Sequence, residues 1–292
     1  MKLRFSLFAA LFMLLPLTAT AQTQLVVFGD SLSDYGNRTI ATSGPNTNPR
    51  SQITGVWVKQ LADQLGLPLT PSNSGGTNYA QGGAVTSGMN VQVGDYLADV
   101  GGAANPTALY VLWGGGNDIN RKARANPLDT AGIRAAATTA VANIESQIRA
   151  LAEAGARYVL WVNMPPLHRT PAALLVPFGL GETVLRPPSQ HFNTLAVQAI
   201  ARLQAEFPGL TIGGMDVYTL FMDIVSRPSA YGLTNVTGTA QGKAVNPDTY
   251  LFWDEIHPTS KGHAILADHA YELIEEATSL WAYDESWAAP AH

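Results

Sequence analysis

A serine near the start of the sequence has the surroundings that nucleophilic catalysis requires. Ser31 stands in Gly29-Asp30-Ser31, directly after the apolar run Leu25–Phe28. A serine that follows a buried strand can be held at the edge of a sheet with its hydroxyl exposed. Because a serine hydroxyl is a poor nucleophile at its ordinary acidity, it needs a base within hydrogen-bond distance. Alone, Gly-Asp-Ser is more typical of a turn or a helix cap, where Ser and Asp are favoured.

The base is found by elimination among six histidines. Five are weaker candidates because they are terminal, lie within the predicted last helix or flank a proline-rich loop: His292, His263, His269, His168 and His191. His257 precedes that helix, and Asp254 stands three residues upstream. In a tight turn, this spacing brings the carboxylate to Nδ1 of the imidazole, where it fixes the tautomer and stabilises the imidazolium. Alone, Asp-x-x-His also fits a turn cap, a metal pair or a surface loop.

A glycine-rich segment supplies a third group of chemical interest. Residues 114–118, Gly-Gly-Gly-Asn-Asp, follow the apolar run Ala108–Trp113. Glycines allow close approach of the backbone to a ligand, and the Asn117 side-chain NH₂ can donate to a developing oxyanion. The segment lacks the endings and spacings of phosphate-binding loops, which disfavours nucleotide binding. A second pair, Gly82-Gly83, by itself indicates a simple turn.

Short apolar runs alternate with helical patterns along the chain. The predicted strands are Leu25–Phe28, Ala108–Trp113, Tyr158–Val162 and Leu210–Ile212, and the predicted helices are Val56–Leu65, Asp129–Ala154, Ser189–Phe207 and Ser260–Ala277. This alternation indicates parallel β-α-β units with helices on both faces of the sheet. We therefore expect an α/β fold, a three-layer α/β/α sandwich with a mainly parallel central sheet. In such folds ligands bind at the carboxyl ends of the strands, where the candidate residues fall.

The N-terminus has the pattern of an export signal. Lys2 and Arg4 precede the apolar stretch Phe5–Leu17, and Ala19-Thr20-Ala21 fits a cleavage site. We expect residues 1–21 to be a signal peptide and residues 22–292 to form one domain that is secreted, periplasmic or bound at the cell surface. No later segment is long and apolar enough to predict a membrane span.

The composition of the chain limits the kinds of partner and chemistry that can be expected of it. The chain has 292 residues, 46% of them hydrophobic and 13% charged, which is an ordinary globular balance. Its net charge of -5 falls to -7 without residues 1–21, since 15 basic residues then face 22 acidic ones, and no basic run is present. Binding to nucleic acid is therefore not expected. With no cysteine, thiol catalysis, cysteine-ligated zinc and disulfides are excluded.

Together these motifs resemble the GDSL-type lipases and esterases of the SGNH hydrolase family. The resemblance rests on four segments in the family's order, which span about residues 25–277: Gly29-Asp30-Ser31-Leu32, Gly82-Gly83, Gly115-Gly116-Asn117-Asp118 and Asp254-x-Ile256-His257. It implies that Ser31 is the nucleophile, His257 the base and Asp254 its orienting partner. It also implies an oxyanion hole formed by the Ser31 N–H, the Gly83 N–H and the Asn117 side chain, with Gly82 as the alternative to Gly83.

The expected function is exported carboxylic-ester hydrolysis through an acyl-enzyme on Ser31, with no cofactor and with an ester or lipid substrate. The same site would serve deacetylation of a carbohydrate or thioester cleavage. A non-catalytic module that binds a glycan or lipid is the main rival from another class. A metal-dependent phosphoesterase is a second rival, with a hard cation held by Asp30, Asp118, Asp254 and His257.

The acyl pocket is poorly defined by the sequence. The apolar loop Pro171–Leu180 follows a predicted strand end. It fits an apolar wall or flap beside the site, and it fits ordinary packing of a long loop onto the core equally well.

Overall fold

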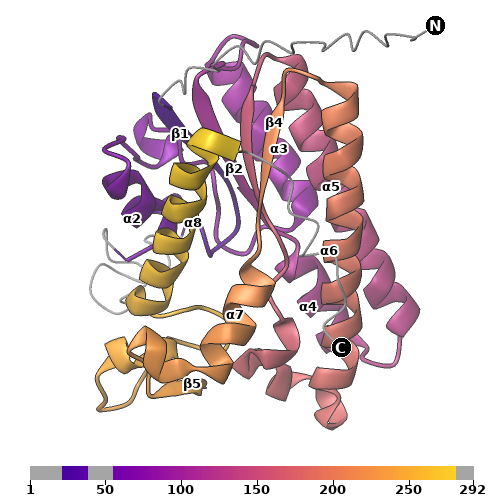
Figure 1. The fold of residues 1–292 in the computed structure, drawn as a ribbon. Coiled ribbons are helices and arrows are strands. Elements are labelled where there is room, and N and C mark those ends of the chain that lie inside the picture. The colour runs from indigo at the N-terminus through magenta and orange to yellow at the C-terminus, as the bar shows by residue number, and fades with distance from the viewer. Residues whose placement is uncertain (1–21, 39–54, 281–292) are drawn as a thin grey trace, which may run out of the picture.

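The computed structural model describes residues 22–38 and 55–280, and the side chains among them up to residue 276. The predicted signal peptide 1–21 and His292 lie outside the described residues. Four parallel strands form the central sheet in the order β1-β2-β3-β4 (Figure 1): β1 Gln24–Gly29, β2 Ala108–Trp113, β3 Tyr158–Val162 and β4 Thr211–Met215. In this register Val27 lies beside Val111, and Val111 beside Leu160.

A short extended segment covers the free edge of β1. The Val27 N–H donates to the Thr77 carbonyl at 2.9 Å, and the Tyr79 N–H donates back to the Val27 carbonyl at 2.7 Å. The Gln81 N–H reaches the Gly29 carbonyl at 3.1 Å. Because β1 thus has a parallel neighbour on each side, its carboxyl end lies where the chain order reverses, which is the usual ligand position in doubly wound folds.

Helices cover both faces of the sheet (Figure 1). On one face lie α3 Thr86–Asp99, α4 Gly116–Ala125, α5 Thr130–Glu153 and α6 Gly181–Glu206, and on the other lie α2 Trp57–Gln64 and α8 Ser260–Leu280. Each face has its own apolar core, because the strand side chains point alternately into the two layers. The predicted α/β/α sandwich with a parallel sheet is confirmed.

Some element bounds differ from the prediction. β2 and β3 have the predicted ends, and Asp129 caps α5 by accepting from the Gly132 N–H. Helix α6 begins eight residues earlier than predicted and continues through Pro187 and Pro188. Each proline removes a backbone hydrogen bond, and burial of side chains on both sides of the pair, such as Leu185 and Phe192, offsets that loss.

Several elements were not predicted. They are α3, α4, α7 Val217–Ser226, and the two parallel strands β5 Asn235–Thr239 and β6 Tyr250–Phe252. Short 3-10 turns complete the described chain: Ser72–Ser74, Leu167–Arg169, Pro171–Leu175, Pro177–Gly179, Pro228–Tyr231 and Pro247–Thr249. Helix α7 and strand β5 lie beyond the carboxyl ends of the central strands (Figure 1).

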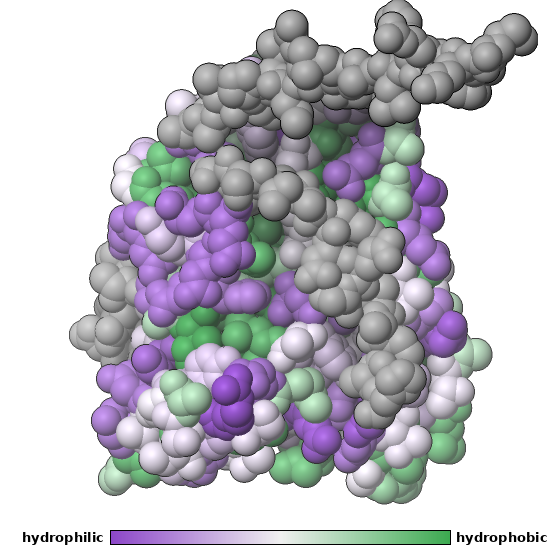
Figure 2. Space-filling view, in the orientation of Figure 1, coloured by the Kyte–Doolittle hydropathy of each residue, from purple (hydrophilic) through white to green (hydrophobic). Residues whose placement is uncertain are grey.

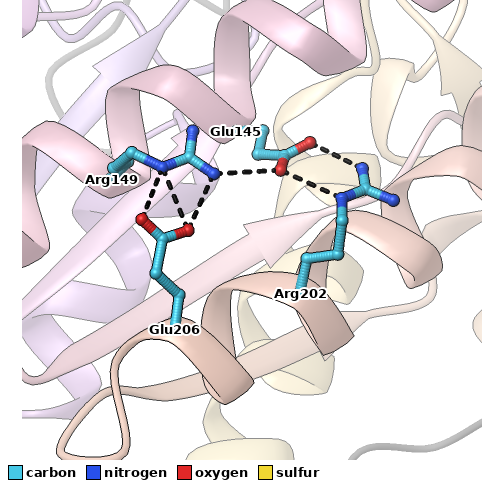
Figure 3. Close-up of polar contacts among 4 residues, drawn as sticks. All are labelled: Glu145, Arg149, Arg202 and Glu206. Carbon is cyan, nitrogen blue, oxygen red and sulfur yellow. Dashed lines mark hydrogen bonds and ion pairs between the residues drawn. The ribbon is translucent and has the colours of Figure 1, made fainter.

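A network of ion pairs joins α5 and α6 on the outer face (Figure 3). Arg149 bridges Glu206 at 3.0 Å and Glu145 at 3.2 Å, and Arg202 reaches Glu145 at 2.7 Å. These pairs lie over the extensive packing contact of the two helices. None of the helices within residues 22–38 and 55–280 has the length and apolar character that crossing a bilayer would demand.

Candidate active site

Ser31 follows the carboxyl end of β1 in a tight turn. The Ser33 and Asp34 N–H groups donate to the Asp30 carbonyl, and the Leu32 N–H donates to the Asp30 carboxylate at 3.0 Å. Position 29 requires glycine because an added Cβ would lie 2.5 Å from the Trp113 carbonyl oxygen. This close approach of β1 to β2 leaves the Ser31 hydroxyl at the edge of the sheet.

His257 is hydrogen-bonded to Ser31 across 226 positions of sequence. Its Nε2 lies 2.7 Å from the Ser31 Oγ, and its Nδ1 lies 2.8 Å from both carboxylate oxygens of Asp254. Because Nδ1–H donates to Asp254, Nε2 is assigned as the acceptor that faces the serine hydroxyl. Residues 31, 257 and 254 therefore form one hydrogen-bonded chain.

The loop between β6 and α8 sets this geometry. The Trp253 N–H donates to the His257 carbonyl at 2.8 Å, which closes a tight turn. The N–H groups of Ile256 and His257 both donate to the Asp254 carboxylate, at 2.9 and 2.8 Å. Asp254 is thus held by backbone donors as well as by the imidazole, and the three-residue spacing has the predicted form.

The other histidines within the described residues lie elsewhere. His191 contacts Thr138 at 2.9 Å on the outer face. Burial lowers the pKa of His168 to about 4, and it also lowers the pKa of His269. His263 is buried within α8. Among the five described histidines, only His257 reaches the Ser31 hydroxyl.

The two adjacent glycines differ in what their N–H groups contact. The Gly82 N–H donates to the Asp34 carboxylate at 2.7 Å. Gly83 adopts a left-handed φ of 77° and borders the cleft, and Arg121 donates to its carbonyl at 2.6 Å. Within the described residues the Gly83 N–H makes no hydrogen bond. Of the two alternatives left open by the sequence, the geometry favours Gly83 as a donor to a ligand.

Asn117 lies in the first turn of α4 and points toward the Ser31 turn. Its Nδ2 donates to the Ala84 carbonyl at 2.8 Å and to the Asp30 carboxylate at 3.3 Å. Neighbouring Asp118 accepts from the N–H and hydroxyl of Thr86. Asp118 therefore ties α4 to the start of α3, whereas Asn117 faces the cleft.

Burial makes the Asp30 carboxyl a weaker acid than an ordinary aspartate, because it raises its pKa. Loss of water, together with the nearby carboxylates of Asp118 and Asp34, raises the pKa of the Asp30 carboxyl to about 7, although the hydrogen bond from the Leu32 N–H opposes the shift. Burial also raises the pKa of Asp118. Asp30 is therefore partly protonated near neutral pH.

These groups surround a cleft of about 320 Å³. Four of the predicted site residues line it directly: Ser31, Gly83, Asn117 and His257. Asp254 lies behind His257. The sequence motifs did not indicate the mainly apolar wall of Met164, Pro165, Leu167 and Thr170, nor the places of Asp34 and Arg38 at the site. Asp34 ends the stretch Gly-Asp-Ser-Leu-Ser-Asp, residues 29–34, which is the sequence signal for its place near the nucleophile.

The structure also bears on the metal site of the rival phosphoesterase hypothesis and on the alternative roles of the loop Pro171–Leu180. Within residues 22–38 and 55–280, no group of three or more His, Asp or Glu side chains is arranged to hold a metal ion. In the loop Pro171–Leu180, Ala172, Ala173 and Val176 are buried, whereas Leu174 and Phe178 are more than four-fifths exposed. The cleft wall ends at Thr170, so the loop combines core packing with an exposed tip.

Comparison with known proteins points to one family. The model of the GDSL-like Lipase/Acylhydrolase family matches residues 25–270. Lipase 1 of Photorhabdus luminescens is 27% identical over 88% of this chain and 50% of its own length. Esterase EstA of Pseudomonas aeruginosa is 27% identical over 88% of this chain and 47% of its own length. The chain spans about half the length of these curated relatives.

Solved structures share the fold at low identity. A lipase from a goat rumen metagenome has a TM-score of 0.51 and 15% identity, with 86% of this chain and 97% of that chain covered. An acetylxylan esterase from Geobacillus stearothermophilus has a TM-score of 0.50 and 14% identity, with 87% and 94% covered.

Proposed function

Because this chain belongs to the GDSL-like lipase/acylhydrolase family, we propose that it hydrolyses carboxylic esters with Ser31 as the nucleophile. The proposal is carried by one observation, the hydrogen-bonded chain from the Ser31 hydroxyl through His257 to the Asp254 carboxylate. This arrangement gives a serine the base that it needs and gives that base an orienting carboxylate.

In the first step, the Ser31 Oγ attacks the carbonyl carbon of the ester while His257 Nε2 accepts the hydroxyl proton. The new bond from Oγ to carbon forms as the carbonyl electron pair moves onto oxygen. Asp254 stays ionised and stabilises the imidazolium through Nδ1–H. The 2.7 Å contact between Ser31 and His257 is short enough for this proton transfer.

The oxyanion is stabilised by the N–H groups of Ser31 and Gly83 and by the Asn117 side chain. Both Asn117 donor hydrogens contact protein oxygens in the structure. The bond to Asp30 is the longer one, at 3.3 Å against 2.8 Å for the bond to Ala84. The donor that faces Asp30 is therefore the one that turns to the substrate.

The second half of the reaction reuses the same groups. His257 gives its proton to the alcohol oxygen as the bond from carbon to that oxygen breaks, and the acyl group stays on Ser31. Water then attacks this ester while His257 takes the water proton, and the carboxylic acid leaves as Ser31 regains its hydrogen. No cofactor enters either half.

Export forms the second part of the proposal and rests on the charged, apolar and small-residue pattern of residues 1–21. Expression of the full chain in a bacterial host, followed by cell fractionation and N-terminal sequencing, tests it. We expect mature protein beginning at Gln22 outside the cytoplasm. Retention of the uncleaved chain in the cytoplasm would contradict export.

The activity is tested by hydrolysis of p-nitrophenyl butyrate, with and without EDTA, by the wild type and by Ser31→Ala. We expect chelator-insensitive activity that the substitution removes. Activity retained in Ser31→Ala, or lost with EDTA, would reject the serine mechanism. Acetylated xylan assayed in parallel tests the carbohydrate deacetylase, and an inactive but folded wild type would favour the binding module.

A further inference from the structure

An apolar pocket of about 50 Å³ adjoins the catalytic cleft on the side of α7, and we name it the α7 pocket. Residues of α7, β6 and the start of α8 form its far wall, among them Val217, Phe221, Ile224, Phe252 and Leu266. Five residues line both the catalytic cleft and the α7 pocket: Leu32, Trp113, Pro165, Thr170 and Ile256. The α7 pocket therefore lies directly beside the cleft that holds Ser31.

The walls of the α7 pocket favour hydrocarbon. Its polar side-chain groups are the Trp113 indole and the Thr170 hydroxyl, and that hydroxyl already donates to the Leu167 carbonyl at 2.7 Å. A charged or strongly hydrated group would lose its water there without replacement. Figure 2 shows hydrophobic surface in the same area, between the lower end of α8 and α7.

We propose that the α7 pocket binds the acyl chain of the ester and selects acyl groups of about four to six carbons. This inference rests on the proposed ester hydrolysis. The pocket has room for roughly three to five water-sized groups beyond the reacting carbonyl carbon. Each methylene that enters it should raise kcat/KM roughly fourfold until the pocket is full.

The α7 pocket suits the acyl group of the ester better than it suits the alcohol group. The alcohol must leave before water can attack, so it needs the open side of the cleft. The acyl group remains covalently bound to Ser31 between the two half-reactions, so the adjoining apolar pocket can hold it throughout. The polar side of the cleft, with Asp30, Arg38 and Asn120, is left for the leaving group and water.

Helix α7 provides a variant and a matched control. The Phe221 ring lines the pocket and packs against Phe252 at 5.6 Å between centroids. Phe221→Ala lengthens the pocket, and Leu220→Trp fills it. Met222 follows Phe221 on the same helix and does not line the pocket, so Met222→Ala controls for changes in helix stability.

The test is kcat/KM of the wild type and the three variants on p-nitrophenyl esters of two, four, six and eight acyl carbons, each normalised to the acetate. We expect the wild type and Met222→Ala to favour four carbons over acetate by roughly fifteenfold, and six carbons by more if the pocket accepts the whole chain. Phe221→Ala should shift the optimum to eight, and Leu220→Trp should abolish the preference. A second series varies the alcohol of acetate esters, and its profile should stay flat.

Identical chain-length profiles in the wild type, Phe221→Ala and Leu220→Trp would overturn the assignment of the α7 pocket. A dependence on alcohol length that Phe221→Ala shifts would also overturn it, because the pocket would then hold the leaving group. In both cases acetate is still hydrolysed, so the proposed function survives. Absence of hydrolysis of every ester by the folded wild type would instead reject the proposed function.

Discussion

Two polar clusters of this molecule differ in how their charges are compensated. On the outer face, Glu145 lies between two arginines and Arg149 lies between two glutamates, so each shared charge has opposite neighbours. In the cleft, the Asp30 carboxyl is buried, and the carboxylates that influence it, those of Asp118 and Asp34, have the same sign. Burial accordingly raises the pKa of Asp30, while the Arg202 guanidinium lowers the pKa of Glu145.

The difference shows what each cluster contributes. Partly exposed ion pairs are screened by water and salt, so the α5–α6 network adds little to stability. The cleft cluster keeps the Asp30 carboxyl desolvated beside carboxylates of the same sign, which is costly for folding and is typical of functional sites. Substitutions in the cleft should therefore change the rate strongly, and substitutions in the network should change neither rate nor stability by much.

The largest effect is expected for His257→Gln. Without the base, the Ser31 hydroxyl keeps its ordinary acidity, and kcat should fall by roughly a millionfold. Because His257 is partly exposed in a loop, the melting temperature should change by only a few degrees. Steady-state hydrolysis and thermal unfolding of the same preparation measure both quantities. A loss of less than tenfold in a folded variant would remove His257 from the mechanism.

Asn117→Ala should reduce kcat by about a hundredfold to a thousandfold, because one oxyanion donor is removed. KM should change little, since the lost bond forms in the transition state. Asn117→Asp is the matched variant, because it keeps the shape and replaces the donor by an acceptor, and it should lose at least as much activity. If both variants raised KM alone, Asn117 would bind the substrate and would not stabilise the oxyanion.

Asp30→Asn tests the stability cost of the cleft. The folded-state pKa of Asp30, about 7, lies above its ordinary value of 3.8. The folded protein therefore holds a proton that the unfolded chain releases, and stability falls as pH rises from about 4 to 7. The amide mimics the protonated acid, so the variant should be more stable at pH 8 by up to about 4 kcal/mol. The gain should shrink toward pH 4, as measured by denaturant unfolding, and a pH-independent difference would contradict this account.

Of these variants, Glu145→Gln should change the free energy of unfolding and the activity least. Removing the shared carboxylate should lower the free energy of unfolding by less than about 1 kcal/mol at pH 7. Because the partners lower the pKa of Glu145, the contribution should fade in acid as the carboxylate protonates, and it should also fade in 1 M salt. Activity should remain that of the wild type. A loss of several kcal/mol would show that the network is not screened as its exposure implies.

The sequence predicts those parts of the fold and site that depend on local pattern. The buried runs of β2 and β3, the turn after β1 and the Asp254-x-x-His257 spacing all have short-range signals. Four polar motifs in order were enough to identify the family, which is confirmed.

The missed parts depend on tertiary contacts. Helix α3 contains Gly88 and Gly94 and is held by bonds such as the one from Thr86 to Asp118. Helix α6 crosses two prolines because the core compensates for them. The choice between Gly82 and Gly83 depends on a hydrogen bond to Asp34, which no spacing could reveal. The α7 pocket is likewise assembled from segments separated in sequence.

The most direct test of the central claim is covalent labelling with a fluorophosphonate, followed by mass spectrometry of the intact protein and of its peptides. We predict one adduct per chain, located on Ser31, that is absent in Ser31→Ala and slowed by orders of magnitude in His257→Gln. An unlabelled wild type, or a label on another residue that persists in Ser31→Ala, would contradict the assignment of Ser31 as the activated nucleophile.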